Sequence, residues 1–518
     1  MPKFVFLWTD VFVLVLVVAL VGYAWHVRRS PALRSAWGSV ARTPSAMAAA
    51  VILLTFTVVG VLDSIHYRPL LPPLEAAQEL MDEDGAEAEI AAAEWLDDAD
   101  GGPVYSPVLR SALDDLLALT QLAHREKTYS APLAVRQFTK ETTLVDGEPV
   151  REFPRLLHAG SLLTDESQHW DDVRQRTLRG LLTGGLLALG LAVLLTLGHR
   201  TQQPGLMAAW RWWWRAGSGI PWRTMWVTAS VLLVLGAVAL TLSVNYHVLG
   251  TDRTGNDVLW QSIKSIRTAL VIGTLTTLAM LPPAIGFGIA AGYFKGRVDD
   301  VIQYLYTTLT SIPGVLLIAA SVLMMQVYID THADLFSTVA SRADLRLFML
   351  CLILGLTGWA GLCRLLRAET LKLRELEYVQ AARAFGVSNW RIMSRHLLPN
   401  LMHIVLITMV LEFSGLVLYE AVLSYLGIGV DPSMNSFGTM IDAARLEMSR
   451  DPMIWWNLLG AFTFLLVLVL SANLFADAVQ MAFDPRTRRF APQALRVPAA
   501  PEARAVTGAT STHTDSHD

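Results

Sequence analysis

The sequence predicts an all-α polytopic membrane protein with about nine transmembrane helices. Of its 518 residues, 53% are hydrophobic, and they are gathered into runs, which is typical of membrane proteins. Nine of these runs are long enough to cross about 30 Å of hydrocarbon. The arginines between the runs favour a single orientation, with the N-terminus outside and the C-terminus inside.

The nine predicted spans follow one another along the whole chain. The first starts close to the N-terminus with only Lys3 ahead of it and no small-residue cleavage site, so we expect a retained anchor and not a signal peptide. The spans are predicted at residues 4–25, 47–65, 178–198, 225–245, 267–291, 302–327, 346–364, 401–421 and 454–476.

Charge assigns each long link to one side of the membrane. The links at 26–46 and 199–224 each hold four arginines and no acid, which favours the cytoplasm. Residues 66–172 carry 22 acidic and 8 basic residues and are predicted to lie outside. Alternation through the later spans places the C-terminus inside. The positive charges of Arg486, Arg488 and Arg489 favour the same side.

Residues 66–177 form a predicted extracytoplasmic acidic domain with α or α+β structure. Leucines between 113 and 122 indicate an amphipathic helix, and Asp146-Gly147 between two β-like runs indicates a hairpin with a two-residue turn. An acidic patch covers 75–100. A solvated face is the favoured interpretation of this patch, with a partner surface as the alternative.

The other N-terminal units are two helices within 1–65 and a unit at 178–224, which joins the third span to a Trp/Arg linker. Tryptophan rings and guanidinium groups are favourable in the lipid headgroup layer, so we expect an interfacial anchor and no nucleic-acid partner. These residues are Trp210, Arg211, Trp212, Trp213, Trp214 and Arg215. The tail at 491–518, rich in Pro, Ala, Thr and Ser, is predicted to be disordered in the cytoplasm.

A polar stretch from Glu377 to Asn400, called the knob here, lies in the loop 365–400 between two apolar spans. Two short amphipathic helices are predicted in it, separated by Gly386 as a left-handed cap. Pro399 is expected to end the second helix, which Ser388 begins. The first helix has an apolar face of Tyr378, Ala381, Ala382 and Phe385, and Trp390, Met393 and Leu397 are expected to share a side of the second.

The motifs of known catalytic sites are missing from the sequence. No GxxxxGK[ST] phosphate loop occurs, and no His or Cys cluster has metal-ligand spacing. We therefore expect no catalytic residue, no metal and no cofactor held by this chain. A protruding helical pair without a nucleotide site of its own is suited to receive force from a separate motor.

The knob resembles the coupling loop of binding-protein-dependent ABC import permeases. Their pattern of Glu-Ala-Ala, three residues, Gly, nine residues, Ile, one residue and Leu-Pro is matched at Ala381, Ala382, Gly386, Leu398 and Pro399. Gln380 and His396 replace the usual Glu and Ile. With these two residues the knob resembles the dipeptide and oligopeptide branch of the family, whose usual sequence here is YVxAARAxG followed by RHxLPN.

Further stretches resemble the C-type permease of that branch and extend the resemblance over about 225–490. Asn256 stands where Arg is usual, and Phe437 where Trp is usual. The matching residues are Gly250, Thr251, Asp252, Gly255 and Asp257; Gly292, Tyr293, Val298 and Asp299; Ser311, Ile312 and Pro313; Leu423 to Gly429, including Gly427, with Pro432 and Gly438; and Asp484, Pro485 and Arg486.

The resemblance implies a type I ABC importer permease core of six spans in 225–490, preceded by three extra spans and the outer domain. It implies a multi-pass subunit of the bacterial inner membrane that is not an enzyme and that moves peptides or similar small solutes inward. The implied partners are a second, B-type permease, two ATPase subunits that bind the ATP, an extracytoplasmic solute-binding protein and the bilayer. The implied ATPase-coupling residues are Glu377, Tyr378, Gln380, Ala381, Ala382, Arg383, Phe385, Gly386, His396, Leu398 and Pro399.

Two carboxylates of the span at 401–421 each allow more than one role. Glu412 lies near the middle of a span, where it could line the translocation cavity or fix helix packing as a hydrogen-bonded carboxyl, and Glu420 could serve a gate or a docking surface. The solute could be a peptide, a nickel complex, an opine or another small molecule. A secondary transporter should show inverted repeats and more polar midspan residues, and a sensor or channel would not need the knob.

Overall fold

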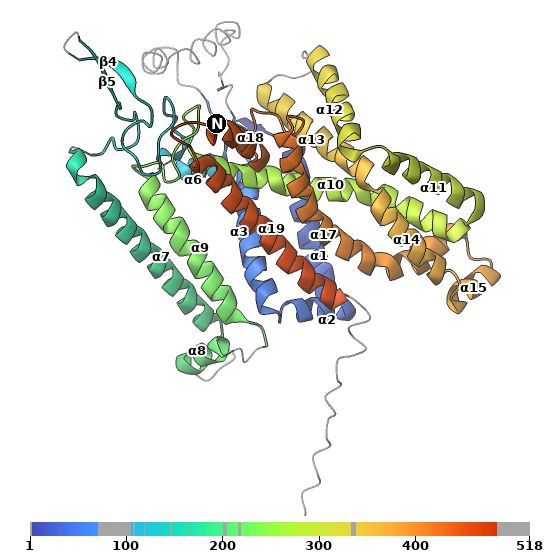
Figure 1. Cartoon of the computed structure of the whole chain (residues 1–518). Coiled ribbons are helices and arrows are strands. Elements are labelled where there is room, and N and C mark those ends of the chain that lie inside the picture. The colour runs from blue at the N-terminus through green and yellow to red at the C-terminus, as the bar shows by residue number, and fades with distance from the viewer. Residues whose placement is uncertain are drawn as a thin grey trace, which may run out of the picture. The chain divides into compact units, whose positions relative to one another are not determined.

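The computed structural model describes residues 3–70, 105–106, 109–118, 120–145, 148–163, 165–199, 205–215, 219–332 and 338–483. Within these ranges the chain is mostly helical, and nine helices are long and apolar enough to cross a membrane (Figure 1). The predicted all-α polytopic class and its nine spans are confirmed. The spans are Trp8–Arg29 (α1), Pro44–Asp63 (α3), Glu166–His199 (η2, Glu166–Gln168, and α7, His169–His199), Trp222–Ser243 (α9), Val258–Phe294 (α10), Gly314–Thr331 (α12), Val339–Leu373 (α13, Val339–Gly358, and α14, Ala360–Leu373), Asn389–Tyr425 (α16, Asn389–Ile392; η5, Met393–Leu397; and α17, Leu398–Tyr425) and Trp456–Phe483 (α19).

Shorter elements connect the spans. A small antiparallel sheet, in the order β1–β2–β3, pairs Phe4 with Tyr67 and Tyr67 with Arg110, so it ties the N-terminus to the segment that follows α3. The short elements are β1 (Lys3–Val5), α2 (Pro31–Val40), β2 (His66–Arg68), β3 (Arg110–Ser111), α6 (Ala112–Leu117), η1 (Gln121–Ala123), β4 (Glu141–Val145), β5 (Glu148–Glu152), α8 (Leu206–Trp214), α11 (Gly296–Ser311), α15 (Glu377–Ala384) and α18 (Phe437–Glu447).

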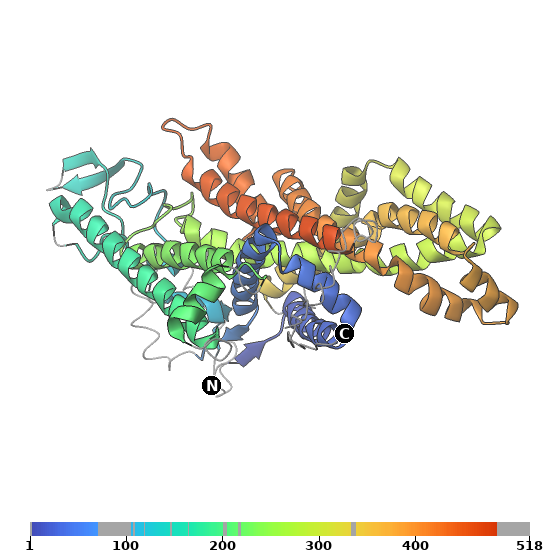
Figure 2. The same ribbon diagram turned by 90° about the horizontal axis from the view of Figure 1, so that it is seen from below.

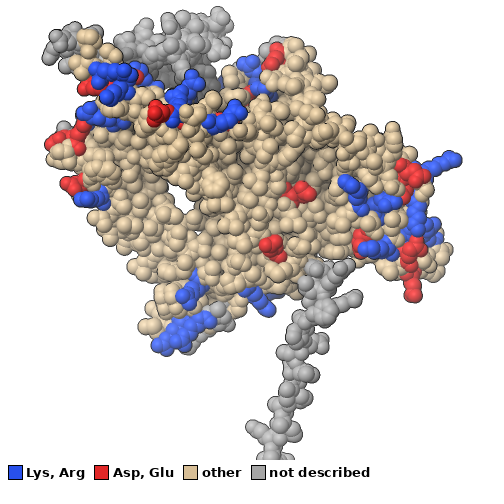
Figure 3. Space-filling model, in the orientation of Figure 1, with Lys and Arg blue, Asp and Glu red and all other residues tan. Residues whose placement is uncertain are grey.

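The spans alternate in direction through the bundle. The strands, α6 and α18 lie at one end, the strand end, whereas α2, α8 and α15 lie at the other, the knob end (Figure 1). In both views α7 and α9 lie on one flank of α3 and α19, and α11, α12 and α15 lie on the opposite flank (Figure 2). Most charged side chains on the face seen in Figure 3 gather at the ends of the bundle, and only isolated acidic ones lie between them.

Helix α10 is the central element of the bundle. It packs against α3, α13, α14, α17 and α19, and about half of its length is buried despite the two prolines Pro282 and Pro283. Close approach depends on small residues: a β-carbon on Gly273 would lie 2.5 Å from the Phe413 ring, and one on Gly292 would lie 2.5 Å from Cβ of Thr370. Since membrane helices gain association energy from such close packing, α10 holds the bundle together.

Helices α7 and α9 form a tightly packed pair. The buried stripe of α7 consists of small residues four positions apart, namely Gly180, Gly184, Ala188, Ala192 and Thr196. A β-carbon on Gly184 would lie 2.6 Å from Cα of Val234 on α9. The small-residue spacing therefore lets the third and fourth spans meet backbone to backbone.

The N-terminal helices are joined to α10 by buried ion pairs. Arg267 Nη2 lies 2.6 Å from an Asp10 oxygen on α1, and Lys264 Nζ lies 2.6 Å from an Asp63 oxygen at the end of α3. Lys264 also lies 2.7 Å from Asp114 of α6. Because a buried charge is stable only when it is paired, these contacts fix α1, α3 and α6 to the core.

One predicted span is broken in the structure. Residues 302–327 were expected to be continuous, but α11 ends at Ser311 and α12 begins at Gly314. Pro313 is the cause, because the residue before a proline avoids the helical conformation and Ile312 is extended, with φ −88° and ψ 133°. The membrane-spanning helix is therefore Gly314–Thr331.

The segment between α3 and α7 has both strands and short helices. Strands β4 and β5 pair with Val145 opposite Glu148, as the predicted two-residue turn requires, while residues 146–147 lie outside the described ranges. The predicted helix at 113–122 is shorter, because α6 ends at Leu117 and η1 begins at Gln121. The acidic patch at 75–100 also lies outside the described residues.

Candidate functional site

The first helix of the knob ends in a Schellman motif. The N–H of Val387 donates to the Ala382 carbonyl (3.1 Å), and the N–H of Gly386 donates to the Arg383 carbonyl (3.0 Å). Gly386 has φ +74°, a conformation that glycine adopts without a steric cost. The predicted cap at Gly386 is confirmed, and it turns the chain sharply between α15 and α16.

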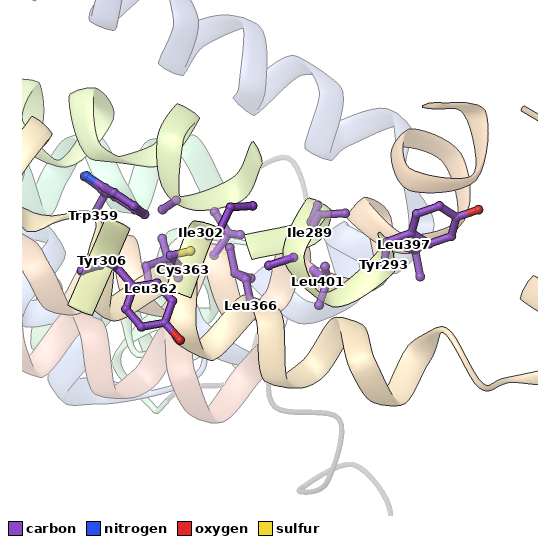
Figure 4. Packing of buried hydrophobic residues seen from close by; sticks show 14 of the residues in the cluster. Ile289, Tyr293, Ile302, Tyr306, Trp359, Leu362, Cys363, Leu366, Leu397 and Leu401 are labelled. Atoms are coloured by element: carbon purple, nitrogen blue, oxygen red, sulfur yellow. The ribbon is translucent and has the colours of Figure 1, made fainter. Parts of the chain in front are cut away.

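Apolar packing fixes the knob to the ends of α10 and α14. Val379, Ile392 and Leu397 are completely buried and belong to one cluster with residues of α10, α14 and α17. Figure 4 shows Tyr293 of α10 and Leu397 at the same end of this cluster, with Leu366 and Cys363 of α14 further along it. The knob is therefore continuous with the core of the bundle.

Polar contacts add to this attachment. The Tyr293 hydroxyl donates to Asn389 Oδ1 (2.8 Å), and Arg374 donates to the Tyr293 carbonyl (2.5 Å). Lys295 Nζ lies 2.9 Å from Glu375 Oε1 and holds the pKa of that carboxyl below its ordinary value. These bonds join the end of α10 to the chain on both sides of α15.

The exposed face of the knob is aromatic. Phe385 is 86% exposed, Trp390 is 76% exposed and Tyr378 is 42% exposed. Ala381 is also exposed, but Ala382 is buried and faces the bundle. The expected apolar face of α15 is thus divided, with Ala382 on the inner side and Tyr378, Ala381 and Phe385 on the outer side.

Polar residues border this aromatic face. Glu377, Gln380 and Arg383 are exposed on α15, and Gln380 Nε2 donates to the Glu375 carbonyl (3.1 Å). Trp390 was expected to share a side with Met393 and Leu397, but it points outward while Leu397 is buried. Its outward position could not be read from helical periodicity, because the Gly386 turn sets the angle between the two helices.

The second half of the knob corrects the prediction for Pro399. The helix does not end there but continues from Asn389 to Tyr425. Residues Met393–Leu397 form a π-helix, and the N–H of Leu398 donates to the Met393 carbonyl. Pro399 directly follows this π-turn, so its missing N–H falls where the regular hydrogen-bond ladder is already interrupted. His396 lies within this π-turn, and its carbonyl accepts from Asn400 Nδ2 (2.7 Å).

An ion pair stabilises the knob end of α11. Arg367 of α14 makes two bonds to Asp299, at 2.5 and 2.7 Å. The neighbouring motif residue Gly292 is needed because a β-carbon there would meet the Arg367 carbonyl at 2.8 Å. The motif residues Gly292 and Asp299 thus lie where α10 and α11 contact α14, whereas Val298 is exposed.

At the strand end, residues 245–257 form a tight loop before α10. Asp257 is the N-cap of α10 and accepts from the Trp260 N–H (3.0 Å). Asp252 accepts from the Thr254 N–H (2.8 Å), the Asn256 N–H (2.9 Å) and Gln261 Nε2 (2.7 Å). Asn256 therefore binds the Asp252 carboxylate through amide hydrogen bonds. The arginine that is usual at this position would offer an ion pair instead.

This loop is the attachment point of residues 105–165. The Ser130 N–H donates to Thr251 Oγ1 (2.6 Å), and the Thr251 N–H donates to the Ser130 carbonyl (3.1 Å). Gly250 and Gly255 have φ of +72° and +78°, and β-carbons on them would collide with the backbone of Ser130 and Glu126. The two glycines thus have a second role, which sequence motifs did not indicate.

A buried histidine joins the same two parts. His247 Nδ1 lies 2.7 Å from Asp257 Oδ2, and its Nε2 lies 3.5 Å from Glu126 Oε1. Burial alone would lower the pKa of His247, but bonding to Asp257 and Glu126 raises it to about 9. Burial raises the pKa of Glu126, yet His247 and three backbone N–H groups together lower it to about 2. These N–H groups belong to Leu157, His158 and Ala159.

The stretch after α17 contains a second Schellman motif. The N–H of Ile428 donates to the Leu423 carbonyl (2.9 Å), and Gly427 has φ +75°. A β-carbon on Gly429 or Gly438 would overlap Ser424. Glu420 is 2% exposed and accepts from Ser424 Oγ (2.7 Å), so in this chain it lies beneath the turn.

Glu412 is placed differently from Glu420. It lies on an exposed face of α17, and it makes no hydrogen bond or ion pair with another described residue. Asp484, Pro485 and Arg486 lie outside the described residues. Within the described ranges, no three His, Cys, Asp or Glu side chains are grouped so that they could hold a metal ion.

A cavity of about 750 Å³ opens at the strand end. Its lining includes Leu7, directly before α1, and residues of α3, α6, α10 and α13, among them Asp63, Lys264, Arg267 and Asp344. Lys264 pairs with Asp63, and Arg267 lies 3.5 Å from Asp344. The positive charges of Lys264 and Arg267 are therefore already balanced by carboxylates of this chain.

Known proteins match the second half of this chain. A family model described as binding-protein-dependent transport system inner membrane component matches residues 284–489. The dipeptide transport system permease protein DppC of Lactococcus lactis is 28% identical over 240 residues, which are 46% of this chain and 64% of that protein. The oligopeptide transport system permease protein OppC of Mycobacterium tuberculosis is 30% identical over 242 residues, 47% of this chain and 77% of that protein. The peptidoglycan transport system permease protein YejE of Agrobacterium fabrum is 34% identical over 245 residues, 47% of this chain and 58% of that protein.

Proposed function

Because this chain belongs to the family of binding-protein-dependent transport system inner membrane components, we propose that it is one permease subunit of an ATP-driven importer of peptides or similar small solutes. It is a multi-pass inner-membrane protein and a transport component, not an enzyme. The peptide class of the solute is supported by the names of the relatives, which are permeases of dipeptide, oligopeptide and peptidoglycan transport systems.

The observation that carries the proposal is the rigid attachment of an exposed aromatic knob. Phe385 and Trp390 present their rings outward, whereas Val379 and Ile392 bury the opposite side of the same two helices. Exposed apolar patches rimmed by polar residues are typical of protein interaction sites. On this proposal the partner is an ATPase subunit, and a groove on it receives the two rings.

Force from the ATPase would travel through α10 and α17. The knob continues directly into α17, and Tyr293 links it to α10, so a displacement of the knob moves two spans together. Rigid-body movement of packed helices is a common way to switch a membrane cavity between its two sides. Ala381 contributes by its small size, because it lets the partner approach the backbone of α15.

A second permease subunit would complete the pathway. Glu412 is exposed near the middle of α17 without a partner in the described part of the chain. A charge at that depth needs a cavity or a facing subunit. We place it at the translocation cavity, where it could meet a peptide amine, and a B-type permease would form the facing wall.

The orientation follows from the charges of the links. The arginine-rich links belong to the knob end, which is therefore the cytoplasmic end, and residues 105–165 would lie outside. A solute-binding protein would then dock at the strand end. The described part of residues 105–165 contacts the 245–257 loop at the strand end, so it would form part of the docking surface.

Co-purification from the native membrane tests the coupling role. The wild-type chain should retain an ATPase and a second permease, whereas Phe385→Glu and Ala381→Glu should release the ATPase and leave the permease pair intact. Both positions are exposed, so the variants should fold. Ser45→Glu, an exposed change in the first turn of α3 at the same end of the bundle, is the control and should retain all partners.

The same experiment separates the alternatives. A secondary transporter, sensor or channel would purify without an ATPase from the start. An ATPase that stays bound to Phe385→Glu and Ala381→Glu alike would place the coupling contact elsewhere and reject the role of the knob.

A further inference from the structure

Helix α8 is a rigid aromatic platform at the knob end of the bundle. Trp213 is completely buried and donates from Nε1 to Thr196 Oγ1 of α7 (3.1 Å). Its ring lies against Trp210 at 4.9 Å and Trp214 at 5.7 Å, and Trp226 of α9 lies 5.8 Å from Trp214. Leu206 and Met207 of the same helix are exposed, which suits a helix lying in the membrane interface.

A pocket of about 540 Å³ opens beside this platform. Its lining residues come from the start of α3, the end of α8 and the start of α9, and they are Pro44, Trp214, Arg215, Pro221, Arg223 and Thr224. This volume lies within the range of about 300–1,000 Å³ that is usual for small-ligand sites. Two membrane-spanning helices, α3 and α9, begin at this pocket, which is where the lipid headgroups would lie.

The pocket has positive charge, and its lining among the described residues includes no acid. The links at 26–46 and 199–224 contain no Asp or Glu. Arg215 and Arg223 are exposed, and neither forms an ion pair with a described residue. Arg42 approaches from the α2–α3 turn, where its Nε lies 3.8 Å from the position of a β-carbon on Gly219. Figure 3 shows Lys and Arg side chains without neighbouring acids at this corner of the molecule.

The geometry favours a phosphate group as the anion that would balance the charges of Arg215 and Arg223. The Arg223 guanidinium lies over the Trp214 ring, 5.1 Å from its centre, which holds the planar fork in place. A guanidinium fork binds two phosphate oxygens at once, and Thr224 adds a hydroxyl donor to the lining. Pro44 and Pro221 supply apolar walls, which suit the glycerol and the upper acyl chains of a lipid.

We propose that this pocket binds the phosphodiester headgroup of an anionic phospholipid. A zwitterionic lipid carries its own cation and gains less from the uncompensated arginines, so the site should select a net negative headgroup. A lipid held between α3, α8 and α9 would brace the second and fourth spans and the α8 helix at the membrane surface. This site is separate from the knob and does not depend on the importer assignment.

The test uses the full-length chain in nanodiscs of mixed phosphatidylglycerol and phosphatidylcholine, followed by native mass spectrometry. Wild type should retain phosphatidylglycerol, and Arg215→Gln with Arg223→Gln should reduce the retained lipid by roughly tenfold or more. Arg28→Gln with Arg34→Gln removes the same charge from exposed arginines outside the pocket and should leave binding unchanged. Arg215→Lys with Arg223→Lys keeps the charge without the fork and should give an intermediate loss.

Three results would overturn the proposal. Equal retention of phosphatidylcholine would show that the site does not select charge, and equal losses in both Arg→Gln pairs would show a diffuse basic surface. Displacement of the lipid by inorganic phosphate at millimolar concentration would mean that the pocket takes the free anion. If the Arg215→Gln with Arg223→Gln protein does not fold, the Lys pair decides between the same outcomes.

Discussion

Nε2 of His247 lies 3.5 Å from Oε1 of Glu126, and both side chains are completely buried. His247 precedes α10, whereas Glu126 belongs to the segment between α3 and α7. Because Asp257 binds the other ring nitrogen at 2.7 Å, the imidazole bridges the segment between α3 and α7 and the loop before α10. The stability of the junction therefore depends on the charge of three groups that meet at one ring.

Loss of the Glu126 charge should weaken this junction. Glu126→Gln removes one partner of a buried charge pair, which typically costs about 3–5 kcal/mol. We expect a lower thermal unfolding temperature and faster proteolysis within residues 105–165. Glu141→Gln, which breaks a more exposed pair with Lys127, should change stability by less than about 1 kcal/mol. Equal effects of the two variants would contradict the role of the buried bridge.

The same bridge predicts a dependence of stability on pH. His247 has a pKa raised from 6.5 to about 9, so its contribution is complete below pH 6.5 and is lost as the pH rises through about 9. Glu126 has a pKa lowered from 4.5 to about 2, so its contribution is lost as the pH falls through about 2. Differential scanning fluorimetry should show a decline between pH 6.5 and 9 that His247→Gln flattens. An identical alkaline decline in that variant would count against the bridge.

Removal of Arg267 should loosen α1 from the bundle. Its guanidinium is buried beside Asp10 and Asp344, so Arg267→Met leaves two carboxylates without their cation. We expect a loss of about 3–5 kcal/mol in the free energy of unfolding and cleavage near the N-terminus by added protease. Arg297→Met, at an exposed position of α11, is the control and should change neither measurement.

Two adjacent glycines of α7 should respond differently to the same substitution. A β-carbon on Gly184 would meet the α9 backbone at 2.6 Å, whereas one on Gly185 would have no heavy atom within 4 Å. Gly184→Leu should therefore separate α7 from α9 and cost about 1–3 kcal/mol or more, while Gly185→Leu should be nearly neutral. Cysteine cross-linking between α7 and α9 would detect the separation, and equal yields in the two variants would refute it.

The turn of the knob should be sensitive to a single methyl group. Gly386→Ala places a β-carbon on a residue with φ +74°, which costs about 1–2 kcal/mol, although nothing else obstructs it. We expect lower ATPase retention and slower uptake with unchanged amounts of protein in the membrane. Gly361→Ala, which also meets no atom within 4 Å but lies in helix α14, should retain the ATPase fully.

Much of the knob could be predicted from local sequence, but its exposed surface could not. The Gly386 cap depends on one residue and its neighbours, so the pattern predicted it correctly. The outward position of Trp390 and the inward position of Ala382 depend on the packing of α10 and α14 against the two short helices. The π-turn before Pro399 was missed because it lengthens one turn without a distinctive residue type.

The sequence by itself determined the membrane class, the nine spans and the location of the knob, because hydrophobic length and charge bias act on each segment separately. Only the tertiary structure decided that Glu126 meets His247, that Asp10 meets Arg267, and that the Trp/Arg linker borders a pocket. Those contacts join residues far apart in the chain. Their energies depend on burial, which the folded bundle alone provides.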